Sequence, residues 1–393
     1  MKAIVVGAGI AGLVAARQLG LAGWDVEVLE KSQAPRPDGY MMDFFGPGVE
    51  ASERIGLYPR LAEAAYHIQS ADYVDTEGRT TCSIDYLRFS KLAGGKVLSL
   101  LRPDIEAAAL AALADVPAGR VRVRYGARVV KARTDGDGVH VLVEDGLRQE
   151  TGADVLIGAD GIHSGVRAGV FGPERDYLRP LGMRAAAFIV TEPALNARFR
   201  GRFILTDTLN RMAGLYGIRQ DEVAAFLVYR DAVSPGKEAA TARQRLRSEF
   251  AGLGDAVERL LDLCPGHPYD DTVAQVVMPR WHTERTVLVG DACGAVSLLA
   301  GQGGSLAIAG AALLGDILGP VTRTRGIGGA LARFEQQWRP VVEVAQKSGR
   351  RTAATFLPRN NTQRLLRRWV IRATRLPGVD QLVAHQILRS IAK

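Results

Sequence analysis

The sequence predicts an α/β fold in which a Rossmann-type domain, built from two stretches of chain, is interrupted by an antiparallel β-sheet domain and followed by a C-terminal helical tail. Three observations predict it. The chain opens with a β-branched strand, a glycine loop and a helix, the start of a βαβ unit. Strand-like runs separated by turns dominate residues 183–229. A buried strand and a glycine-rich stretch at 285–315 then return to the pattern of the first domain.

Length and composition allow two or three domains. The chain has 393 residues, of which 47% are hydrophobic and 23% charged, as in ordinary globular proteins. The net charge is +8, yet residues 346–393 alone carry 11 basic side chains and one acidic side chain. Because the rest of the chain is close to neutral, the charge is weak evidence for nucleic-acid binding, and no nucleic-acid partner is expected.

The cysteines, the histidines and one long uncharged stretch bear on location, metal binding and membrane insertion. The three cysteines, Cys82, Cys264 and Cys293, are widely separated, which favours a reducing, cytoplasmic location without disulfides. The six histidines show no metal-ligand spacing, so no metal site is expected. The uncharged stretch 292–315 is long enough to span a membrane, but its six glycines and Gln302 argue against a transmembrane helix.

The glycine loop predicts a dinucleotide site. In G-x-G-x-x-G, Gly7 makes the turn, Gly9 lets a pyrophosphate approach the backbone, and Gly12 lets the helix pack on the strand. The N-terminus of the helix adds partial positive charge. Glu30 closes the second strand, where a carboxylate can accept hydrogen bonds from ribose hydroxyls. The alternative is a tight strand-to-helix turn without a ligand.

The remaining elements follow from local signals. Residues 25–31 form the second strand, and after a proline-rich loop residues 40–46 form a strand that glycine and proline end. A helix is expected over 100–115, with Pro103 in the first turn, where proline is tolerated. Residues 120–150 alternate as half-buried strands, and 240–263 are expected to be helical.

The domain boundaries are expected as follows. Residues 1–175 form the first part of the Rossmann-type domain, with 71–95 contributing to the sheet of the second domain. Residues 176–275 form the antiparallel sheet domain, residues 276–345 return to the first domain, and residues 346–393 form a basic helical tail.

Three further polar residues each have a plain structural explanation. Arg102 precedes a helix and could be a solvated first-turn arginine. Asp160 and Gly161 follow a strand and could form a β-turn with an Asx hydrogen bond. Asp291 could be a helix N-cap. Only their combination with the glycine loop suggests a site.

Together these segments resemble the FAD-dependent class A monooxygenases, typified by para-hydroxybenzoate hydroxylase. The matching segments, in the order of that family over residues 1–346, are GAGIAG with Glu30, LLRPDIEAAAL, GADGIHSGVR and GDACGAVSLLAGQGGSLAIAGA. The layout of GYMMDFFGPGVEASERIGLY and ADYVDTEGR is most similar to the tetracycline-inactivating monooxygenases and hydroxylases of aromatic polyketides.

The resemblance implies the para-hydroxybenzoate hydroxylase fold and an FAD site. The glycine loop would hold the pyrophosphate, Glu30 would bind the adenosine ribose, and the backbone of Val129 would contact the adenine. Asp291 would bind the ribityl and pyrophosphate portion. Asp160 would serve both FAD and the nicotinamide donor. The full set of expected cofactor-binding residues is Gly7, Gly9, Ala11, Gly12, Glu30, Lys31, Arg102, Val129, Asp160, Gly161, Asp291, Gly301, Gln302 and Gly303.

The implied reaction uses NAD(P)H and O₂ to hydroxylate a bulky aromatic or polyketide-like molecule through a flavin hydroperoxide. No metal or protein nucleophile is required, and NAD(P)H would bind transiently because no second glycine fingerprint follows. An apolar pocket would exclude water. Candidates to line it, each of which could instead be ordinary core or surface, are Met42, Asp43, Phe188, Arg211, Met212 and Tyr216.

Two positions depart from the family pattern. Gly294 stands where the family commonly has histidine, and Leu298 stands where it has proline near the flavin. These departures leave the positioning of the flavin and the electrostatics on the substrate side open.

The tail predicts an amphipathic helix. Leu365, Leu366, Trp369 and Val370 share one face, with Arg364, Arg367, Arg368, Arg372 and Arg375 elsewhere. Such a helix could pack as a cap on the flavin or substrate domain, or could lie on an anionic membrane. A second short helix is expected after Pro377 and Gly378.

Other functions remain open at this point. One is a flavin-dependent reductase or dehydrogenase of a lipid-like substrate, docked at the membrane surface by the tail. Another is a non-catalytic flavin-binding module. The W-x-W-x-I-P signature of flavin-dependent halogenases does not occur in the sequence. The chain could be a monomer or a homodimer.

Overall fold

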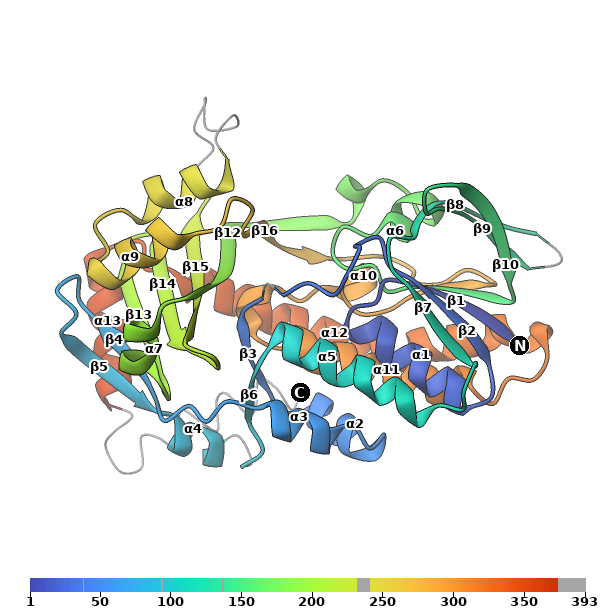
Figure 1. The fold of residues 1–393 in the computed structure, drawn as a ribbon, viewed down its shortest axis with the longest axis horizontal. Coiled ribbons are helices and arrows are strands. Elements are labelled where there is room, and N and C mark those ends of the chain that lie inside the picture. Colours follow the sequence, from blue (N-terminus) through green and yellow to red (C-terminus); the bar gives the residue numbers. More distant parts are fainter. Residues whose placement is uncertain (38, 93–94, 136–137, 232–240, 374–393) are drawn as a thin grey trace.

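The computed structural model describes residues 1–37, 39–92, 95–135, 138–231 and 241–373. The described chain forms two connected parts, each built around its own β-sheet (Figure 1). The expected second helix of the tail, after Pro377 and Gly378, lies outside the described residues.

The first part is built on a five-stranded parallel sheet in the order β17-β11-β1-β2-β7. Its central strands β1 and β11 are largely apolar because both faces of the sheet are covered. They are β1 (Lys2–Val6), β2 (Asp25–Leu29), β7 (Val121–Arg124), β11 (Val155–Gly158) and β17 (Thr286–Leu288). The chain therefore returns to the first sheet through β17 after the second domain is complete.

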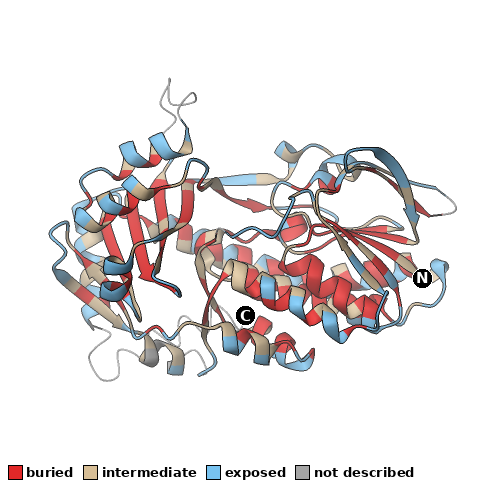
Figure 2. Cartoon of the chain, viewed as in Figure 1, coloured by how far each residue is buried: buried red, intermediate tan, exposed pale blue. Residues whose placement is uncertain are grey.

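Helices cover one face of this sheet, and a small antiparallel sheet covers the other (Figure 1). The helical elements are α1 (Ile10–Leu21), α2 (Pro47–Arg54), α3 (Tyr58–Ala64), α5 (Arg102–Ala111), η1 (Ala112–Asp115), α11 (Gly303–Leu318), η4 (Thr324–Gly326) and α12 (Ile327–Phe356). The small sheet consists of β8 (Arg128–Thr134), β9 (Val139–Glu144) and β10 (Arg148–Ala153). Buried side chains fill most of α1 and α11, which cross the core of this domain (Figure 2).

Short elements connect these layers near the edge of the parallel sheet. They are α6 (Gly165–Val170), η2 (Glu174–Asp176), α10 (Asp291–Gly294) and η3 (Leu298–Ala300). A two-stranded ribbon of β3 (Met41–Phe44) and β6 (Leu98–Leu101) leads toward the second domain.

The second part is built on a seven-stranded sheet in the order β16-β12-β15-β14-β13-β4-β5. All neighbours are antiparallel except β13 and β4. The strands are β4 (Ser70–Val74), β5 (Thr80–Asp85), β12 (Leu178–Thr191), β13 (Arg202–Thr208), β14 (Arg211–Gly217), β15 (Glu222–Arg230) and β16 (Tyr269–Val276). Residues from the 71–95 segment thus supply β4 and β5, followed by α4 (Tyr86–Leu92).

The two faces of the seven-stranded sheet have different partners. One face packs under α7 (Pro193–Phe199), α8 (Ala242–Phe250) and α9 (Asp255–Leu263). The other face packs toward the first domain, where side chains of η3 and α12 join its apolar cluster. Because side chains alternate along a strand, this arrangement decides which residues can face a ligand between the domains.

The stretch 240–263, expected to be helical, forms two helices. Between them Gly254 has φ +103°, and a Cβ there would lie 2.6 Å from the carbonyl oxygen of Thr76. The chain therefore turns at this glycine and begins α9.

The C-terminal part of the described chain contains two helices. The expected boundary at residue 346 falls inside α12, which continues to Phe356. After a short turn, α13 (Asn361–Ala373) lies beside the edge strand β5 (Figure 1).

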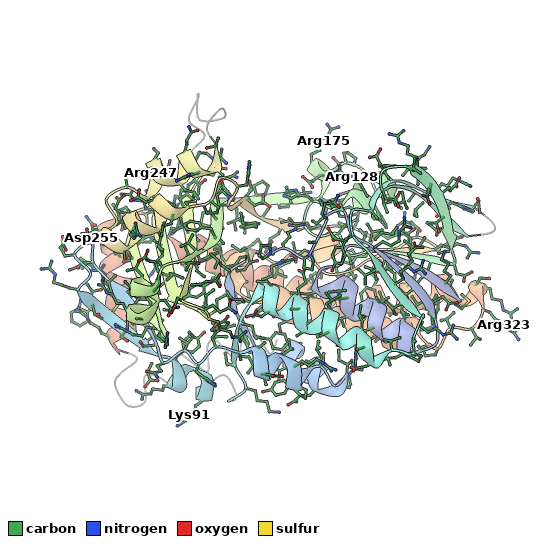
Figure 3. All side chains as sticks on the ribbon, in the orientation of Figure 1. Lys91, Arg128, Arg175, Arg247, Asp255 and Arg323 are labelled. Atoms are coloured by element: carbon green, nitrogen blue, oxygen red, sulfur yellow. The ribbon has the colours of Figure 1, made fainter. Side chains whose placement is uncertain are left out.

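Charged side chains lie mostly on the outside of both parts. The labelled side chains in Figure 3 point away from the ribbon and are exposed; they are Lys91, Arg128, Arg175, Arg247, Asp255 and Arg323. Within the described residues, no helix combines the length and apolar character needed to cross a membrane.

Candidate cofactor-binding and active site

The glycine loop joins β1 to α1 in a space that tolerates no side chain at two positions. Gly7 has φ +106°, and a Cβ there would lie 2.5 Å from the carbonyl oxygen of Ala159. A Cβ on Gly12 would lie 1.9 Å from the carbonyl oxygen of Gly7. At Gly9 a Cβ would meet only Nη2 of Arg102, at 3.8 Å. The loop is therefore closed on its protein side, and Gly9 faces Arg102.

Glu30 lies beside this loop at the end of β2. Its carboxylate accepts hydrogen bonds from the backbone N–H groups of Ala8, at 3.0 Å, and Ser32, at 2.8 Å. Burial alone would raise the pKa of Glu30, but these hydrogen bonds hold it below its usual value. An ionised carboxylate next to the glycine loop can accept hydrogen bonds from hydroxyl groups.

The segment before β8 runs next to Glu30. The N–H of Ala127 donates to the carbonyl oxygen of Glu30 at 2.8 Å. Val129 follows in β8 and is half-buried against the core of the first domain, whereas Lys31 is exposed. The structure thus brings Val129 near Glu30 but shows no contact for the Lys31 side chain among the described residues.

Arg102 is the first residue of α5 and forms an ion pair with Glu106 at 2.9 Å. Burial raises the pKa of Glu106, and the charge of Arg102 offsets part of that effect. The same charge acts on Asp291, whose pKa burial also raises. Arg102 therefore lies within electrostatic reach of the glycine loop, of Glu106 and of Asp291.

Asp291 begins α10 directly after β17. The Asp291 side chain is exposed to solvent, yet the surrounding protein displaces enough water to raise its pKa. A carboxylate on the wall of a cleft has both properties. The preceding residue, Gly290, has φ +64°, which turns the chain sharply after the strand.

Two tyrosines that the motifs did not predict share this wall. The rings of Tyr40 and Tyr269 lie 6.2 Å apart between centroids. Burial raises the pKa of each, and the charge of Asp291 raises it further. Tyr269 lies in β16 of the second domain and Tyr40 just before β3, and no local signal in the sequence marks either residue.

Asp160 organises the loop after β11. It accepts hydrogen bonds from Oγ of Ser164 and from the N–H of Val166, at 3.1 Å. Ser164 in turn caps α6 by accepting from the N–H of Arg167 at 2.9 Å. Both oxygens of Asp160 therefore have partners in its own loop, which is the plain structural explanation; contact with a cofactor or nicotinamide donor stays a prediction.

Arg167 connects this loop to α10. Its side chain is fully buried and donates to the carbonyl oxygens of Ile162, at 2.7 Å, and Ala292, at 3.0 Å. No sequence signal marks Arg167 as a site residue, although it closes the GADGIHSGVR segment. Because it joins two loops more than 120 residues apart, Arg167 fixes the distance between Asp160 and Asp291.

The N-terminus of α11 opens into free space. Gly301 has φ +66°, Gln302 is the N-cap and Gly303 is the first helical residue. A Cβ on Gly301, on Gly303 or on Gly161 would meet no described atom within 4 Å. The first N–H groups of this long helix therefore point their partial positive charge toward a space that a flat ring system can enter.

The backbone just before this helix is strained. Ser297 has φ +100°, which is rare for a residue other than glycine, and its Oγ accepts from the N–H of Leu299 at 3.3 Å. Such conformations concentrate at functional sites. Leu298 begins η3 and packs against the apolar sheet face, so the departure from proline places a side chain between the two domains.

Of the six substrate candidates, Met212 and Tyr216 lie on β14 of the second sheet, and Met42 and Asp43 lie on the β3–β6 ribbon. Met42 is buried, and its Sδ lies 2.6 Å from where a Cβ on Gly304 would stand. Tyr216 accepts a hydrogen bond at its hydroxyl from the N–H of Met41. Met212 packs in the same cluster as residues of η3.

Asp43 belongs to a polar group next to these residues. It accepts hydrogen bonds from the hydroxyls of Tyr86 and Ser99, the latter at 3.1 Å. Burial raises the pKa of Asp43, and these two hydrogen bonds offset part of the increase. The carboxylate thus lies on the ribbon that joins the two domains.

The structure does not bring Phe188 and Arg211 to this group. Phe188 is fully buried in the cluster under α7, α8 and α9. Arg211 donates to Thr208, at 3.0 Å, and to the carbonyl oxygen of Glu249 at the end of α8. Both point to the helix-covered face, because neighbouring residues of a strand face opposite sides and the sequence pattern did not show which side was which.

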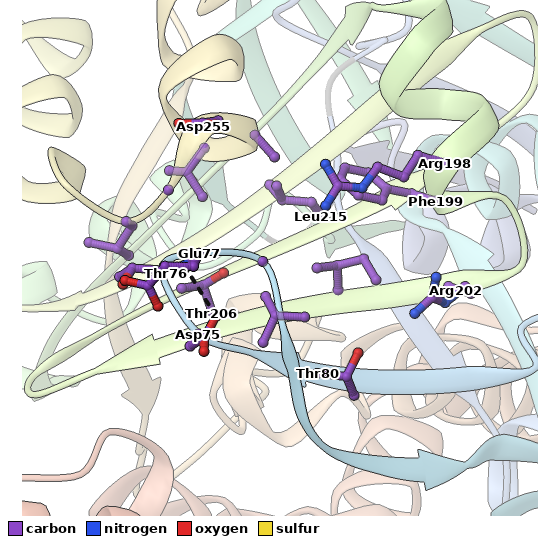
Figure 4. A pocket seen from close by; sticks show the side chains of 17 residues that line it. Asp75, Thr76, Glu77, Thr80, Arg198, Phe199, Arg202, Thr206, Leu215 and Asp255 are labelled. Atoms are coloured by element: carbon purple, nitrogen blue, oxygen red, sulfur yellow. Dashed lines mark hydrogen bonds between the residues drawn. The ribbon is translucent and has the colours of Figure 1, made fainter.

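A separate cavity of about 110 Å³ lies on that helix-covered side (Figure 4). Its wall includes Asp75 and Glu77 of the β4–β5 turn, Arg198 of α7 and Asp255 of α9. None of the expected cofactor or substrate residues lines it, so it is not part of the site between the domains.

Close packing explains why glycine rather than histidine stands at position 294. A Cβ at this position would lie 2.7 Å from Cγ1 of Val342 in α12 and 3.7 Å from the ring of Trp281. The space in which a histidine side chain would begin is therefore filled by α12.

Replacing Gly294 by histidine is expected to lower the free energy of unfolding by about 2 kcal/mol or more, since an extra side chain in a packed core forces neighbours apart. Thermal or denaturant unfolding of the purified protein measures the change. Gly329→Ala is the matched control, because a Cβ there meets no described atom within 4 Å and alanine favours a helix. Equal stability of Gly294→His and the parent protein would show that α12 moves freely and that packing does not explain this glycine.

A family model described as an FAD binding domain matches residues 1–348. The chain belongs to this FAD-binding family. The match spans both stretches of the first domain and the inserted sheet, and the predicted cofactor, FAD, is confirmed. Bound FAD would supply two-electron redox chemistry and reactivity toward O₂.

Relatives and solved structures agree with this assignment. The chain is 34% identical over 324 residues to an uncharacterized protein of Mycobacterium tuberculosis, MT1298, covering 80% of this chain and 84% of the relative. It is 28% identical over 370 residues to a flavin-dependent monooxygenase of an unknown prokaryotic organism, covering 91% and 90%. The crystal structure of the tetracycline destructase Tet(55) is 26% identical, with a TM-score of 0.78 over 98% of this chain and 97% of that chain.

These findings confirm the predicted fold class and the predicted enzyme class, an FAD-dependent monooxygenase. The geometry also fits the cofactor. The closed glycine loop, the ionised Glu30, the cleft carboxylate Asp291 and the open N-terminus of α11 lie along one side of the first domain. The individual contacts of each residue with FAD stay predictions.

Proposed function

We propose that this enzyme uses NAD(P)H and O₂ to hydroxylate a bulky aromatic or polyketide-like small molecule. The observation that carries the proposal is the position of the open N-terminus of α11 next to an apolar sheet face. Leu298 and Leu299 of η3 stand directly before that helix and pack with Met212 and Leu205 of the sheet. A reacting ring held there would lie between helix N–H groups and apolar side chains.

Each part of this wall has a role that follows from its chemistry. The N–H groups at Gly303 and Gly304 would stabilise negative charge on the reduced cofactor. The apolar side chains of the sheet would exclude water, which protects an oxygen-transfer reaction from wasteful decay. Tyr216 would hold the ribbon against the sheet through Met41 and so keep the two domains at a constant distance.

The names of two similar proteins support a substrate that contains a ring system. Relatives include flavin-dependent monooxygenases and an FAD-dependent urate hydroxylase of Mycolicibacterium vanbaalenii, 26% identical over 324 residues. The solved relative at 26% identity is a tetracycline destructase. Urate and tetracycline are both ring systems, and an apolar sheet face suits the same class.

Hydroxylation can be tested with the purified holoenzyme in air. We expect oxidation of NADH or NADPH to accelerate when a suitable phenolic polyketide is added, and the product to gain one oxygen atom by mass spectrometry. Labelled O₂ should place the label in the product. The Gly9→Ala variant, expected to fold with weakened FAD binding, is the matched control.

The second candidate function is reduction or dehydrogenation of a lipid-like substrate, which the exposed apolar side of α13 favours. Products that change only in hydrogen content would support it and contradict hydroxylation. A protein that holds FAD but consumes neither nucleotide with any substrate would contradict both.

A further inference from the structure

Helix α13 presents an apolar surface to solvent. Leu365, Leu366, Trp369 and Val370 are 56%, 64%, 69% and 49% exposed. They form two pairs, each spaced by one turn, on one side of the helix. We call this surface the apolar side of α13. The other large exposed apolar residues of the described chain are scattered over several elements, as is normal for a protein surface.

Three arginines of the same helix contact the rest of the protein. Arg368 pairs with Asp207 at 3.1 Å, and Arg367 lies 3.8 Å from the same carboxylate, whose side chain is fully buried. Arg367 also donates to the carbonyl oxygen of Phe356 at 2.6 Å. Arg372 donates to the carbonyl oxygen of Thr81 in β5 at 2.8 Å. These contacts fix the rotation of α13, so the apolar side faces outward.

This arrangement is the reverse of the usual packing of a surface helix. An amphipathic helix normally buries its apolar side and exposes its charges. Here the arginines reach carbonyl oxygens and one buried carboxylate, and most of the apolar area is left uncovered by the described residues. Ile371 is the one large apolar residue of α13 that is buried.

The charge around the apolar side selects between possible partners. Residues 346–373 contain eight basic and no acidic side chains, and among the described residues only the carboxylate of Asp207 pairs with α13. Arg359, two residues before the helix, and Arg351, in the last part of α12, are exposed. A second copy docked through α13 would bring two strongly cationic surfaces together, whereas anionic lipid headgroups would neutralise them.

We infer that α13 docks this enzyme on an anionic lipid membrane. The apolar side of α13 enters the boundary between headgroups and acyl chains, and the exposed Arg351 and Arg359 contact the headgroups. With 13 residues at 1.5 Å rise each, α13 is roughly 20 Å long and lies in the plane of the membrane rather than across it. Trp369 is suited to this interface because it combines a large apolar ring with one N–H donor.

Trp369 also provides a specific reporter. The chain has four tryptophans, and the other three, Trp24, Trp281 and Trp338, are buried at 2%, 2% and 7% exposure. We expect vesicles of phosphatidylcholine and phosphatidylglycerol that carry brominated acyl chains to quench the fluorescence of the full-length holoenzyme. Pure phosphatidylcholine vesicles should bind much more weakly, and added salt should weaken binding to the anionic vesicles.

Two variants separate this surface from the rest of the molecule. Leu366→Ser should reduce partition into anionic vesicles by about tenfold or more, since burial of one large apolar side chain is worth at least that factor. Leu147→Ser is the matched control, because Leu147 is 70% exposed in the turn between β9 and β10. It should bind vesicles as the parent protein does.

Three results would overturn the inference. The first is lack of binding to anionic vesicles. The second is binding without quenching of Trp369, which would place the contact elsewhere. The third is protection of Trp369 from acrylamide in the protein without vesicles, which would show that another surface already covers the helix. Light scattering would then distinguish a second copy, which doubles the mass, from residues 374–393 of the same chain. None of these readouts depends on catalytic activity.

Discussion

The Gly12→Ala variant is expected to lose both FAD and most of its stability. The added Cβ would lie 1.9 Å from the carbonyl oxygen of Gly7, and that carbonyl belongs to the loop between β1 and α1. Backbone atoms cannot rotate away as a flexible side chain can, so α1 must move off the sheet. We expect the free energy of unfolding to fall by more than about 3 kcal/mol. Flavin absorbance and thermal unfolding of the purified variant measure the two effects.

Gly9→Ala provides the matched control in the same loop. A Cβ on Gly9 would meet only Nη2 of Arg102, at 3.8 Å, which is ordinary contact. This variant should therefore fold normally, yet bind FAD at least about tenfold more weakly if the pyrophosphate lies against this glycine. Unchanged FAD affinity in Gly9→Ala would show that the pyrophosphate does not approach the loop here.

Asp291→Asn is expected to stabilise the apoprotein while weakening FAD binding. Burial raises the pKa of Asp291, and Arg102 offsets only part of the shift. An acid with a raised pKa favours folding fully below its unfolded pKa, about 4, and that contribution is lost as pH rises through the higher folded pKa. Above the folded pKa the ionised carboxylate therefore destabilises the apoprotein, and asparagine removes this cost.

The same carboxylate should benefit the holoenzyme. A charged acceptor makes stronger hydrogen bonds to hydroxyl groups than an amide does, so the FAD dissociation constant of Asp291→Asn should rise about 10–100-fold. Thermal unfolding of the apoprotein between pH 4 and 8 measures the change in stability. Titration with FAD measures the change in affinity. Asp316→Asn, an exposed carboxylate on the outer part of α11, is the control. A less stable apoprotein at neutral pH would contradict this account of Asp291.

The parallel sheet, the glycine loop and Glu30 could be predicted because their signals are local. Gly7, Gly9 and Gly12 stand at a spacing that only a strand-to-helix turn explains, and the structure shows the close approaches that require glycine at Gly7 and Gly12. Glu30 ends the next strand and so reaches the loop by strand geometry alone. Family resemblance added Asp291 and the glycines before α11, whose surroundings fit the same cofactor.

The wall opposite these residues could not be predicted in the same way. Phe188 and Met212 both lie on strands of one sheet, and a single step along a strand decides whether a side chain faces the cofactor domain or the helices. Tyr40 and Tyr269 are 229 positions apart and meet only because β16 passes the ribbon at β3. The role of Arg167 depends on its hydrogen bond to the carbonyl oxygen of Ala292, which is 125 positions away in the chain.

Sequence was thus sufficient for the fold class, for FAD as the cofactor and for the amphipathic character of α13, because short-range spacing carries that information. Folding in three dimensions was needed to show which sheet face meets the cofactor domain, why Gly294 has no room for a side chain, and which way α13 is turned. The reason is physical: each of these depends on contacts between segments distant in the chain, and a buried partner such as Asp207 can reverse the orientation that hydrophobicity alone favours.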